Sequence, residues 1–169
     1  MSVGMQAYYL NNYGNYYSYT KNYKASLQTF LAMMAFLEKH HKTDTFDMYL
    51  CKLNLADIYL NLDKVALSEK YLAEIEPWFA ENGNEVSIYY VNSIRIGQAV
   101  KQGNMAKVKD ILSHEQGSAS MEFSLRQIRN RYLRKYYEAI GDYRGAYDNL
   151  RTDVQQNDYL QNKRIKMRA

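Results

Sequence analysis

The sequence predicts an all-α fold in which four helix–turn–helix hairpins stack as a solenoid, and three observations predict it. First, an aromatic residue, a Gly-Asp-Tyr-like turn and a small residue recur along the chain, most plainly at Tyr137, 141–146 and Leu150. Second, almost no stretch alternates apolar and polar residues as a half-buried strand does. Third, 1 proline and 8 glycines in 169 residues leave little room for a loop-rich fold.

The first hairpin is expected to join helices over residues 6–19 and 23–40. The second of these helices carries an apolar stripe at steps of three and four residues: Leu27, Phe30, Leu31, Met34 and Leu37. The polar residues that follow are expected to form a turn, with Asp44 or Thr45 as the N-cap of the next helix.

The second hairpin is expected to join helices over residues 46–61 and 64–79. Pro77 should kink or end the later helix near Glu76, because proline has no N–H to donate and its ring crowds the preceding turn. Residues 81–84 are polar and contain a glycine, so they predict the next turn.

The last two hairpins are expected to contain helices over 85–102, 105–113, 121–140 and from 143 onward. A polar Gly/Ser loop at 115–120 separates them, and Gly141 is the expected left-handed end of its helix. One anchor position in each first helix marks the copies, and the spacing between anchors decreases from about 42 to about 38 along the chain. The anchors are Gly14, Ala56, Ile96 and Arg134.

These hairpins resemble the tetratricopeptide repeat. The first copy supplies Leu10, Tyr13, Gly14, Tyr17, Tyr23, Ser26, Phe30 and Met33 in the register of that motif. The second supplies Leu55, Ala56, Tyr59, Val65, Ser68, Leu72 and Ile75, and the fourth supplies Leu133, Tyr137, Gly141, Tyr143, Ala146 and Leu150. The third keeps mainly Ala99, Gly103, Met105 and Leu112. The period departs from the motif, because the copies here recur every ~40 positions, which is longer than the period of the family.

The resemblance implies a right-handed superhelix and one domain over residues 1–169. Its repeats would cover 6–40, 46–80, 85–113 and 121–153, followed by a helical extension over 154–169. The resemblance also implies a non-catalytic domain that binds a protein or peptide in its concave groove.

The long period, the 18 tyrosines and the basic C-terminal tail are similar to the sensor region of bacterial membrane-bound histidine kinases and related regulators. That resemblance implies a part in two-component signal transduction. The domain would be extracytoplasmic (periplasmic) as a piece of a membrane sensor, and cytoplasmic otherwise. The alternatives are a free-standing scaffold or adaptor and an RNA-binding helical repeat.

The family register assigns candidate groove residues to the first helix of each hairpin. They are Tyr8, Asn11, Asn15, Tyr19, Asp57, Asn61, Tyr90, Ser93, Arg131 and Lys135. Asparagine can bind both backbone groups of an extended peptide, and tyrosine adds rigid contact area. A clamp for a peptide carboxylate is not expected, because Asn11, Tyr90 and Ile94 stand where the clamp needs lysine and arginine.

No catalytic or metal site is expected. Cys51 is the only cysteine, and the adjacent His40 and His41 point about 100° apart on a helix, so they cannot share one ion. The sequence contains no nucleophile elbow, no phosphate-binding glycine loop and no HExxH motif. We therefore expect no enzyme activity, no cofactor and no metal.

The positive charge is uneven along the chain. Residues 1–100 carry 8 Lys/Arg and 10 Asp/Glu, whereas residues 101–169 carry 14 and 8. Arg131, Arg134 and Lys135 are expected to form a local patch, either a solvated helix face or a site for an acidic peptide. Nucleic acid is not the expected partner, because the pI of 8.9 falls just short of the usual basic footprint.

The N-terminal helix is not an obvious polar cap for a repeat array. Six of its residues are tyrosines: Tyr8, Tyr9, Tyr13, Tyr16, Tyr17 and Tyr19. Arrays need polar outer faces at both ends to remain soluble. We therefore also expect self-association into a homodimer built on that face.

Overall fold

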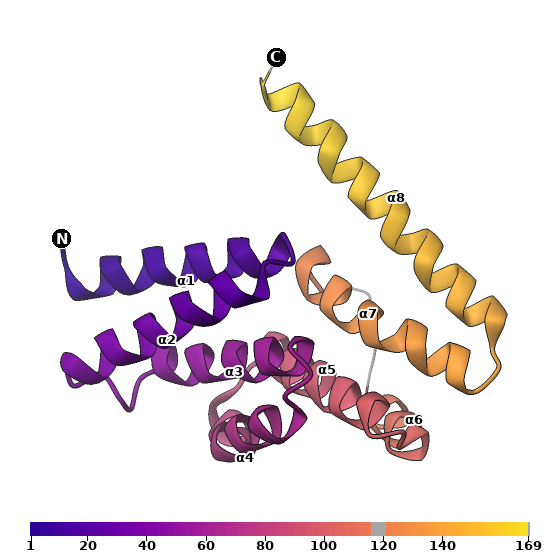
Figure 1. The fold of residues 1–169 in the computed structure, drawn as a ribbon, viewed down its shortest axis with the longest axis horizontal. Helices are drawn as coiled ribbons and strands as arrows, with labels where there is room; N and C mark the ends of the chain where they lie inside the picture. Colours follow the sequence, from indigo (N-terminus) through magenta and orange to yellow (C-terminus); the bar gives the residue numbers. More distant parts are fainter. Residues whose placement is uncertain (116–120, 169) are drawn as a thin grey trace. The chain divides into compact units, whose positions relative to one another are not determined.

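The computed structural model describes residues 1–115 and 121–168, and in them it is helical throughout, with no strand (Figure 1). The helices are α1 (Val3–Tyr19), α2 (Tyr23–Lys39), α3 (Phe46–Asn61), α4 (Val65–Asn82), α5 (Glu85–Lys101), α6 (Met105–Ser113), α7 (Phe123–Ala139) and α8 (Tyr143–Arg168). The all-helical prediction is therefore confirmed. Most of the loop expected at 115–120 lies outside the described residues.

The chain divides into two compact units, Met1–Asn84 and Glu85–Ala169. The first unit contains the antiparallel hairpins α1/α2 and α3/α4, with α2 packed on α3. The second contains the pairs α5/α6 and α7/α8, with α7 packed on α5. No helix in the described part of the chain combines the length and apolar character that crossing a bilayer requires.

The first helix of every hairpin ends in the same turn. A residue in the left-handed region follows each helix: Lys21 (φ 63°), Asp63 (φ 61°), Gly103 (φ 73°) and Gly141 (φ 77°). The next residue donates its N–H to the carbonyl five residues back in each case: Asn22 to Tyr17 (2.7 Å), Lys64 to Tyr59, Asn104 to Ala99 and Asp142 to Tyr137 (2.8 Å each). This is the Schellman arrangement, which satisfies carbonyls that a helix end leaves free.

The turns recur with the spacing of the sequence anchors. Each left-handed residue lies seven positions after the anchor of its hairpin. The residue type differs between the turns: Lys21 and Asp63 take in the first and second turns the conformation that glycine takes in the third and fourth.

A buried hydrogen bond joins the two helices of both hairpins in the first unit. Ser26 Oγ donates to the carbonyl of Gly14 at 2.8 Å, and Ser68 Oγ donates to the carbonyl of Ala56 at 2.7 Å. The sequence separation of donor and acceptor is the same in each hairpin, so the two bonds are repeats of one contact. In the two hairpins of the second unit, the position of this serine is taken by Val108 and Ala146, which are buried and apolar.

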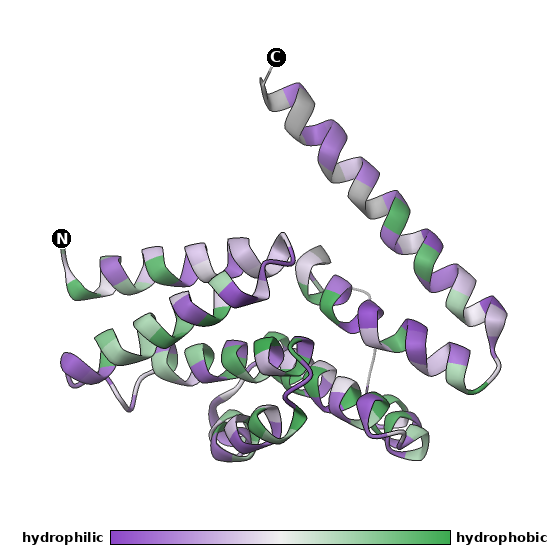
Figure 2. Cartoon of the chain, in the orientation of Figure 1, coloured by the Kyte–Doolittle hydropathy of each residue, from purple (hydrophilic) through white to green (hydrophobic). Residues whose placement is uncertain are grey.

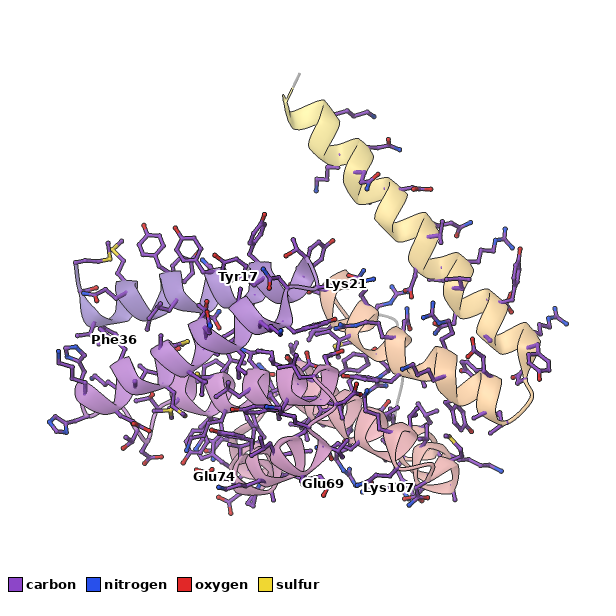
Figure 3. All side chains as sticks on the ribbon, viewed as in Figure 1. Tyr17, Lys21, Phe36, Glu69, Glu74 and Lys107 are labelled. Carbon is purple, nitrogen blue, oxygen red and sulfur yellow. The ribbon has the colours of Figure 1, made fainter. Side chains whose placement is uncertain are left out.

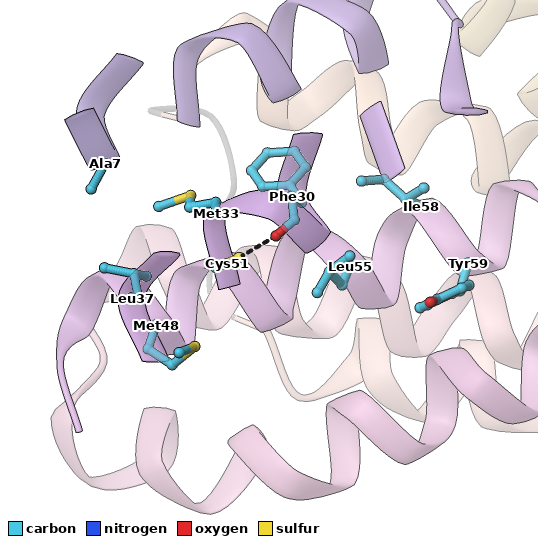
Figure 4. Packing of buried hydrophobic residues seen from close by; sticks show 9 residues of the cluster. All are labelled: Ala7, Phe30, Met33, Leu37, Met48, Cys51, Leu55, Ile58 and Tyr59. Carbon is cyan, nitrogen blue, oxygen red and sulfur yellow. Dashed lines mark hydrogen bonds between the residues drawn. The ribbon is translucent and has the colours of Figure 1, made fainter. Parts of the chain in front are cut away.

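The core of the first unit lies where α2 crosses α1 and α3 (Figure 4). Buried side chains from the three helices form it: Ala7, Phe30, Met33, Leu37, Met48, Cys51, Leu55, Ile58 and Tyr59. Cys51 Sγ donates to the carbonyl of Phe30 at 3.3 Å, which ties α3 to α2. Deleting one large side chain from such a site costs roughly 3–5 kcal/mol of stability, so these contacts decide whether the hairpins stay stacked.

The end expected for α4 near Glu76 is wrong. Pro77 lies inside a helix that continues to Asn82. Proline removes the hydrogen bond to the carbonyl of Ala73, but Ala73 is exposed and Pro77 is not buried in the core, so water can satisfy that carbonyl. Beyond Pro77, Phe79 is buried and Trp78 stacks on Tyr49 with ring centroids 4.2 Å apart, and these contacts hold the last turn in place.

The remaining sequence expectations about helix ends are close to the structure. The N-cap of α3 is Thr45, one of the two residues expected, and its hydroxyl accepts the N–H of Met48 at 3.3 Å. Gly141 is in the left-handed conformation after α7, as expected. In the second unit α7 buries Arg129, Tyr132, Leu133 and Tyr136, and the buried arginine leads to the site described next.

Candidate peptide-binding groove

A groove of about 610 Å³ lies in the second unit, over the crevice between α7 and α8. Its walls also include Tyr89 of α5, Leu112 near the end of α6, and Glu115, two residues after α6 ends. The lining residues are Tyr89, Leu112, Glu115, Arg126, Arg129, Asn130, Leu133, Tyr137, Asp142, Gly145, Asp148, Asn149 and Thr152. The volume is in the range of small-ligand and short-peptide sites.

Helical periodicity explains which residues reach the groove. On α7 they recur mostly at steps of three and four from Arg126 to Tyr137, and a similar series runs from Asp142, just before α8, to Thr152 within it. At a rise of about 1.5 Å per residue, the stretch from Arg126 to Tyr137 spans about 16 Å. An extended peptide rises about 3.3 Å per residue, so the groove matches a peptide of about five residues.

Arg129 fixes one end of the groove. Its Nε donates to Ser93 Oγ at 2.9 Å, and its Nη2 donates to the carbonyl of Tyr89 at 3.2 Å. The guanidinium also forms a two-pronged ion pair with Glu115, from Nη2 to Oε1 at 2.7 Å and from Nη1 to Oε2. Its carbon Cζ lies 3.7 Å from the centre of the Tyr89 ring.

This network makes Arg129 a structural residue. The side chain is 3% exposed, and its charge is balanced by the carboxylate of Glu115. Because Ser93 Oγ gives its own hydrogen to the Tyr89 carbonyl at 2.7 Å, its oxygen is free to accept from Arg129. Burial raises the pKa of the Tyr89 hydroxyl, although the nearby Arg129 opposes the shift. One arginine thus joins α5, α7 and the chain after α6 into a rigid wall.

Two asparagines and an aspartate form a second polar row between α7 and α8. Asn130 Nδ2 donates to Asp153 Oδ1 at 2.8 Å, and Asn149 Nδ2 donates to Asn130 Oδ1 at 3.2 Å. The side-chain amide oxygen Oδ1 of Asn149 is buried and accepts no hydrogen bond from any described residue. A buried acceptor without a donor costs about 1–3 kcal/mol.

The groove has opposite charges at its two ends. Arg126 lies close enough to Tyr89 to lower the pKa of that hydroxyl against the larger effect of burial. At the other end, Asp142 contributes to raising the pKa of Tyr137, after burial and Tyr136. Asp148, which is exposed, follows Asp142 along the chain and lines the same groove. Leu112 and Leu133 line the wall with apolar surface.

The candidate residues of α1 lie outside this groove. Tyr8 is 62% exposed, Asn15 and Tyr19 are also exposed, and Asn11 is half-buried. The side-chain amide oxygen Oδ1 of Asn11 has no hydrogen-bond donor among the described residues. These side chains belong to the first unit, whereas the groove is built from the second.

The other candidates are spread over α3, α5 and α7. Asp57 is buried, and Asn61 Nδ2 donates to its backbone carbonyl at 2.8 Å and to its Oδ1 at 3.3 Å. Tyr90 is half-buried. Ser93 is 1% exposed and binds Arg129, so its role is to position that side chain.

On α7 the expected pair does not line the groove. Arg131 is half-buried and Lys135 is exposed, and neither is among the groove residues. The same helix instead presents Arg126, Asn130 and Leu133. The sequence did carry a sign of this, because Arg129 shares the three- and four-residue spacing of the buried Tyr132, Leu133 and Tyr136. A charged residue on an apolar stripe indicates a paired, buried charge.

Within the described residues, no group of three or more His, Cys, Asp or Glu side chains is placed to hold a metal ion. The groove offers hydrogen-bond donors, hydrogen-bond acceptors and apolar walls. Comparison of the chain with family models, with curated proteins and with solved structures gave no match.

Proposed function

We propose that this chain is a non-catalytic helical-repeat domain, similar to tetratricopeptide arrays, that binds a short extended segment of another protein in the groove along α7 and α8. The observation that carries the proposal is the groove itself, which is about 610 Å³ and is held rigid by the Arg129 network. Rigid walls lower the entropy lost on binding, which favours recognition. The right-handed solenoid stacking of the hairpins is part of the same proposal, supported by the four repeated turns.

The chemistry of the walls defines the peptide. An acidic residue should bind near Arg126 and a basic residue near Asp142, while Asp148 adds negative charge between the two ends. Two or three apolar side chains between them would cover Leu112 and Leu133.

We further propose that the domain serves as the sensor or interaction region of a bacterial signalling protein, on the strength of the resemblance given by the repeats and the basic tail. Bound peptide would bridge α7 and α8, and α8 continues from Thr152 at the end of the groove to Arg168. A helix of this length could pass a change in the groove to a following module. A free-standing scaffold would use the same groove without such a module.

A panel of pentapeptides tests the groove. Peptides with an acidic and a basic end around an apolar centre should bind, and peptides of equal length with neutral ends should bind about tenfold more weakly, a difference of about 1.4 kcal/mol. Binding is measured by fluorescence polarisation, and the site by amide NMR shifts of residues that line the groove.

Three variants make the test specific. Arg126→Ala and Asp148→Ala should each weaken the bipolar peptide several-fold, because each removes a charge contact at a partly exposed site. Lys107→Ala, on the exposed surface of α6 and outside the groove, should leave binding unchanged. Equal binding by bipolar and neutral peptides, or shifts located away from α7 and α8, would remove the proposal.

A further inference from the structure

The outer face of α1 is unusually apolar and uncharged for a surface helix. Tyr9, Tyr13 and Tyr16 are 43%, 59% and 60% exposed, and with Asn12 and Tyr17 they line a hollow of about 370 Å³. Figure 3 shows rings standing along α1 on the side away from α2. Residues 1–20 contain no Asp, Glu, Lys or Arg. Surface helices normally carry charges on their solvent face, so this face resembles one that is covered.

The repeat register identifies what kind of surface this is. When the turn at Lys21 is aligned with the turn at Asp63, four tyrosines of α1 correspond to four residues of α3. Tyr9, Tyr13, Tyr16 and Tyr17 correspond to Cys51, Leu55, Ile58 and Tyr59. Those four residues of α3 are core residues of the first unit, where α2 packs on α3. The tyrosines of α1 therefore occupy the positions at which a first helix receives the second helix of a preceding hairpin.

The last helix presents the complementary surface. Tyr143, Tyr147, Leu150 and Val154 of α8 recur at steps of four, three and four and are 71%, 63%, 42% and 50% exposed. When the turn at Gly141 is aligned with the turn at Lys21, these positions correspond to Tyr23, Leu27, Phe30 and Met34 of α2. All four of those residues belong to the α2 core or pack against it. Figure 2 shows isolated hydrophobic segments along the otherwise polar α8.

We propose that two copies of this chain associate head to tail, with the α8 stripe of one copy packed on the α1 tyrosine face of the next. The contact would repeat between chains the packing of α2 on α3 within the first unit. A second copy is the partner that fits these faces, because in the repeat register they correspond to the two halves of the α2–α3 interface. Tyrosine suits such a face, since its ring is buried on contact and its hydroxyl stays hydrated otherwise.

The two faces differ, so the interface is heterologous. A dimer with two α1 faces in contact would pair tyrosines with tyrosines and leave both α8 stripes exposed. Head-to-tail pairing leaves one free α1 face and one free α8 stripe at the ends of the assembly. The assembly therefore adds further copies as the protein concentration rises, unless it closes into a ring. One contact between two hairpins is at the small end of protein interfaces, so we expect micromolar or weaker affinity.

Two blocked variants distinguish the arrangements. The head-blocked variant is Tyr13→Arg with Tyr16→Arg, and the tail-blocked variant is Leu150→Arg with Val154→Arg. Each should associate at least tenfold more weakly than the unmodified chain, because an unpaired charge would be buried at the interface. Mixed in equal amounts they should form a 1:1 dimer that does not grow, since only one intact pair of faces remains. Sedimentation velocity over a concentration series measures all three samples.

The control carries equal charge elsewhere. Leu67→Arg with Val86→Arg changes exposed apolar residues outside both faces, and it should associate like the unmodified chain. Circular dichroism checks that each variant is folded, and the single variants Tyr16→Arg and Val154→Arg replace any double variant that is not. An unmodified chain that stays monomeric at all concentrations overturns the proposal. So does a tail-blocked variant that dimerises alone, which would indicate pairing of two α1 faces.

Discussion

A Cβ placed on Gly14 would stand 2.6 Å from Cζ of the Phe30 ring. The ring is fully buried, so it has no room to withdraw. In the second hairpin the corresponding residues are Ala56 and Leu72, a larger anchor opposite a smaller side chain. The two side chains at this contact therefore have a similar total volume in both hairpins, with the smaller anchor facing the larger side chain in the first hairpin.

Gly14→Ala should destabilise the protein by about 2–3 kcal/mol, because overpacking a buried contact forces side chains from their preferred rotamers. Adding Phe30→Leu should recover part of this loss, since it recreates the Ala56/Leu72 pair of the second hairpin. Urea unfolding of both single variants and the double variant measures the coupling. Additive losses in the double variant would contradict the volume argument.

Ser26→Ala and Ser68→Ala should each cost about 1 kcal/mol, because each removes a buried donor to a carbonyl of the facing helix. The reciprocal change is Ala146→Ser in the fourth hairpin, where the carbonyl at the corresponding position is that of Arg134. We expect Ala146→Ser to be neutral in thermal unfolding. A loss as large as that of Ser26→Ala would show that the serine contact is not transferable between hairpins.

Lys21→Gly should stabilise the protein by about 1 kcal/mol, because the left-handed region costs an L-residue about 1–2 kcal/mol and glycine almost nothing. Lys21 has φ of 63°, which lies in that region. Part of the gain is lost because glycine also makes the unfolded chain more flexible. Gly141→Ala, at the same position of the fourth hairpin, is the matched reverse change and should destabilise. If both changes shift the melting temperature in the same direction, left-handed strain is not the cause.

Local sequence signals were enough for the helices and most of their ends. Gly103 and Gly141 mark their turns directly, whereas Lys21 and Asp63 take the same conformation without a local sign and are found only by the repeat spacing. The helix end predicted from Pro77 was wrong. The effect of a proline depends on whether the carbonyl that loses its hydrogen bond faces water, and that depends on the tertiary structure rather than on the local sequence.

The groove was less accessible to sequence reasoning. Its key contacts join Arg129 to Ser93 and Tyr89, which lie far earlier in the chain, and no local pattern brings those together. Family register placed candidates on the first helix of each hairpin, whereas the groove also uses α8. The periodic stripe on α7 could have indicated Arg129 as buried, but not its partners.

Arg129→Met should destabilise the protein by about 3 kcal/mol, because it leaves the Glu115 carboxylate without its partner and removes the hydrogen bonds that Arg129 donates to Ser93 Oγ and the Tyr89 carbonyl. Arg129→Lys should recover little, since an ammonium cannot form the two-pronged pair with a carboxylate. The double variant Arg129→Met with Glu115→Gln should be more stable than Arg129→Met alone. Chemical denaturation tests the series, and equal stability of the two would mean that the ion pair is not what Arg129 contributes.

Cys51 should be unreactive in the folded protein and control part of its alkaline stability. The thiol is fully buried, and burial raises its pKa to about 12, so almost no thiolate exists at pH 8. Iodoacetamide should modify it only after unfolding in urea.

The raised pKa of Cys51 also makes the stability of the protein depend on pH. The stabilising effect of the protonated thiol is complete below the unfolded pKa of about 8.5 and is lost as the pH rises towards 12. The other groups titrate alike in Cys51→Ala, so this variant is the reference. Relative to it, the free energy of unfolding of the unmodified protein should fall by about 1.4 kcal/mol per pH unit above about pH 8.5. A constant difference between the two proteins from pH 8 to pH 10, or rapid alkylation of the native chain, would contradict a buried neutral thiol.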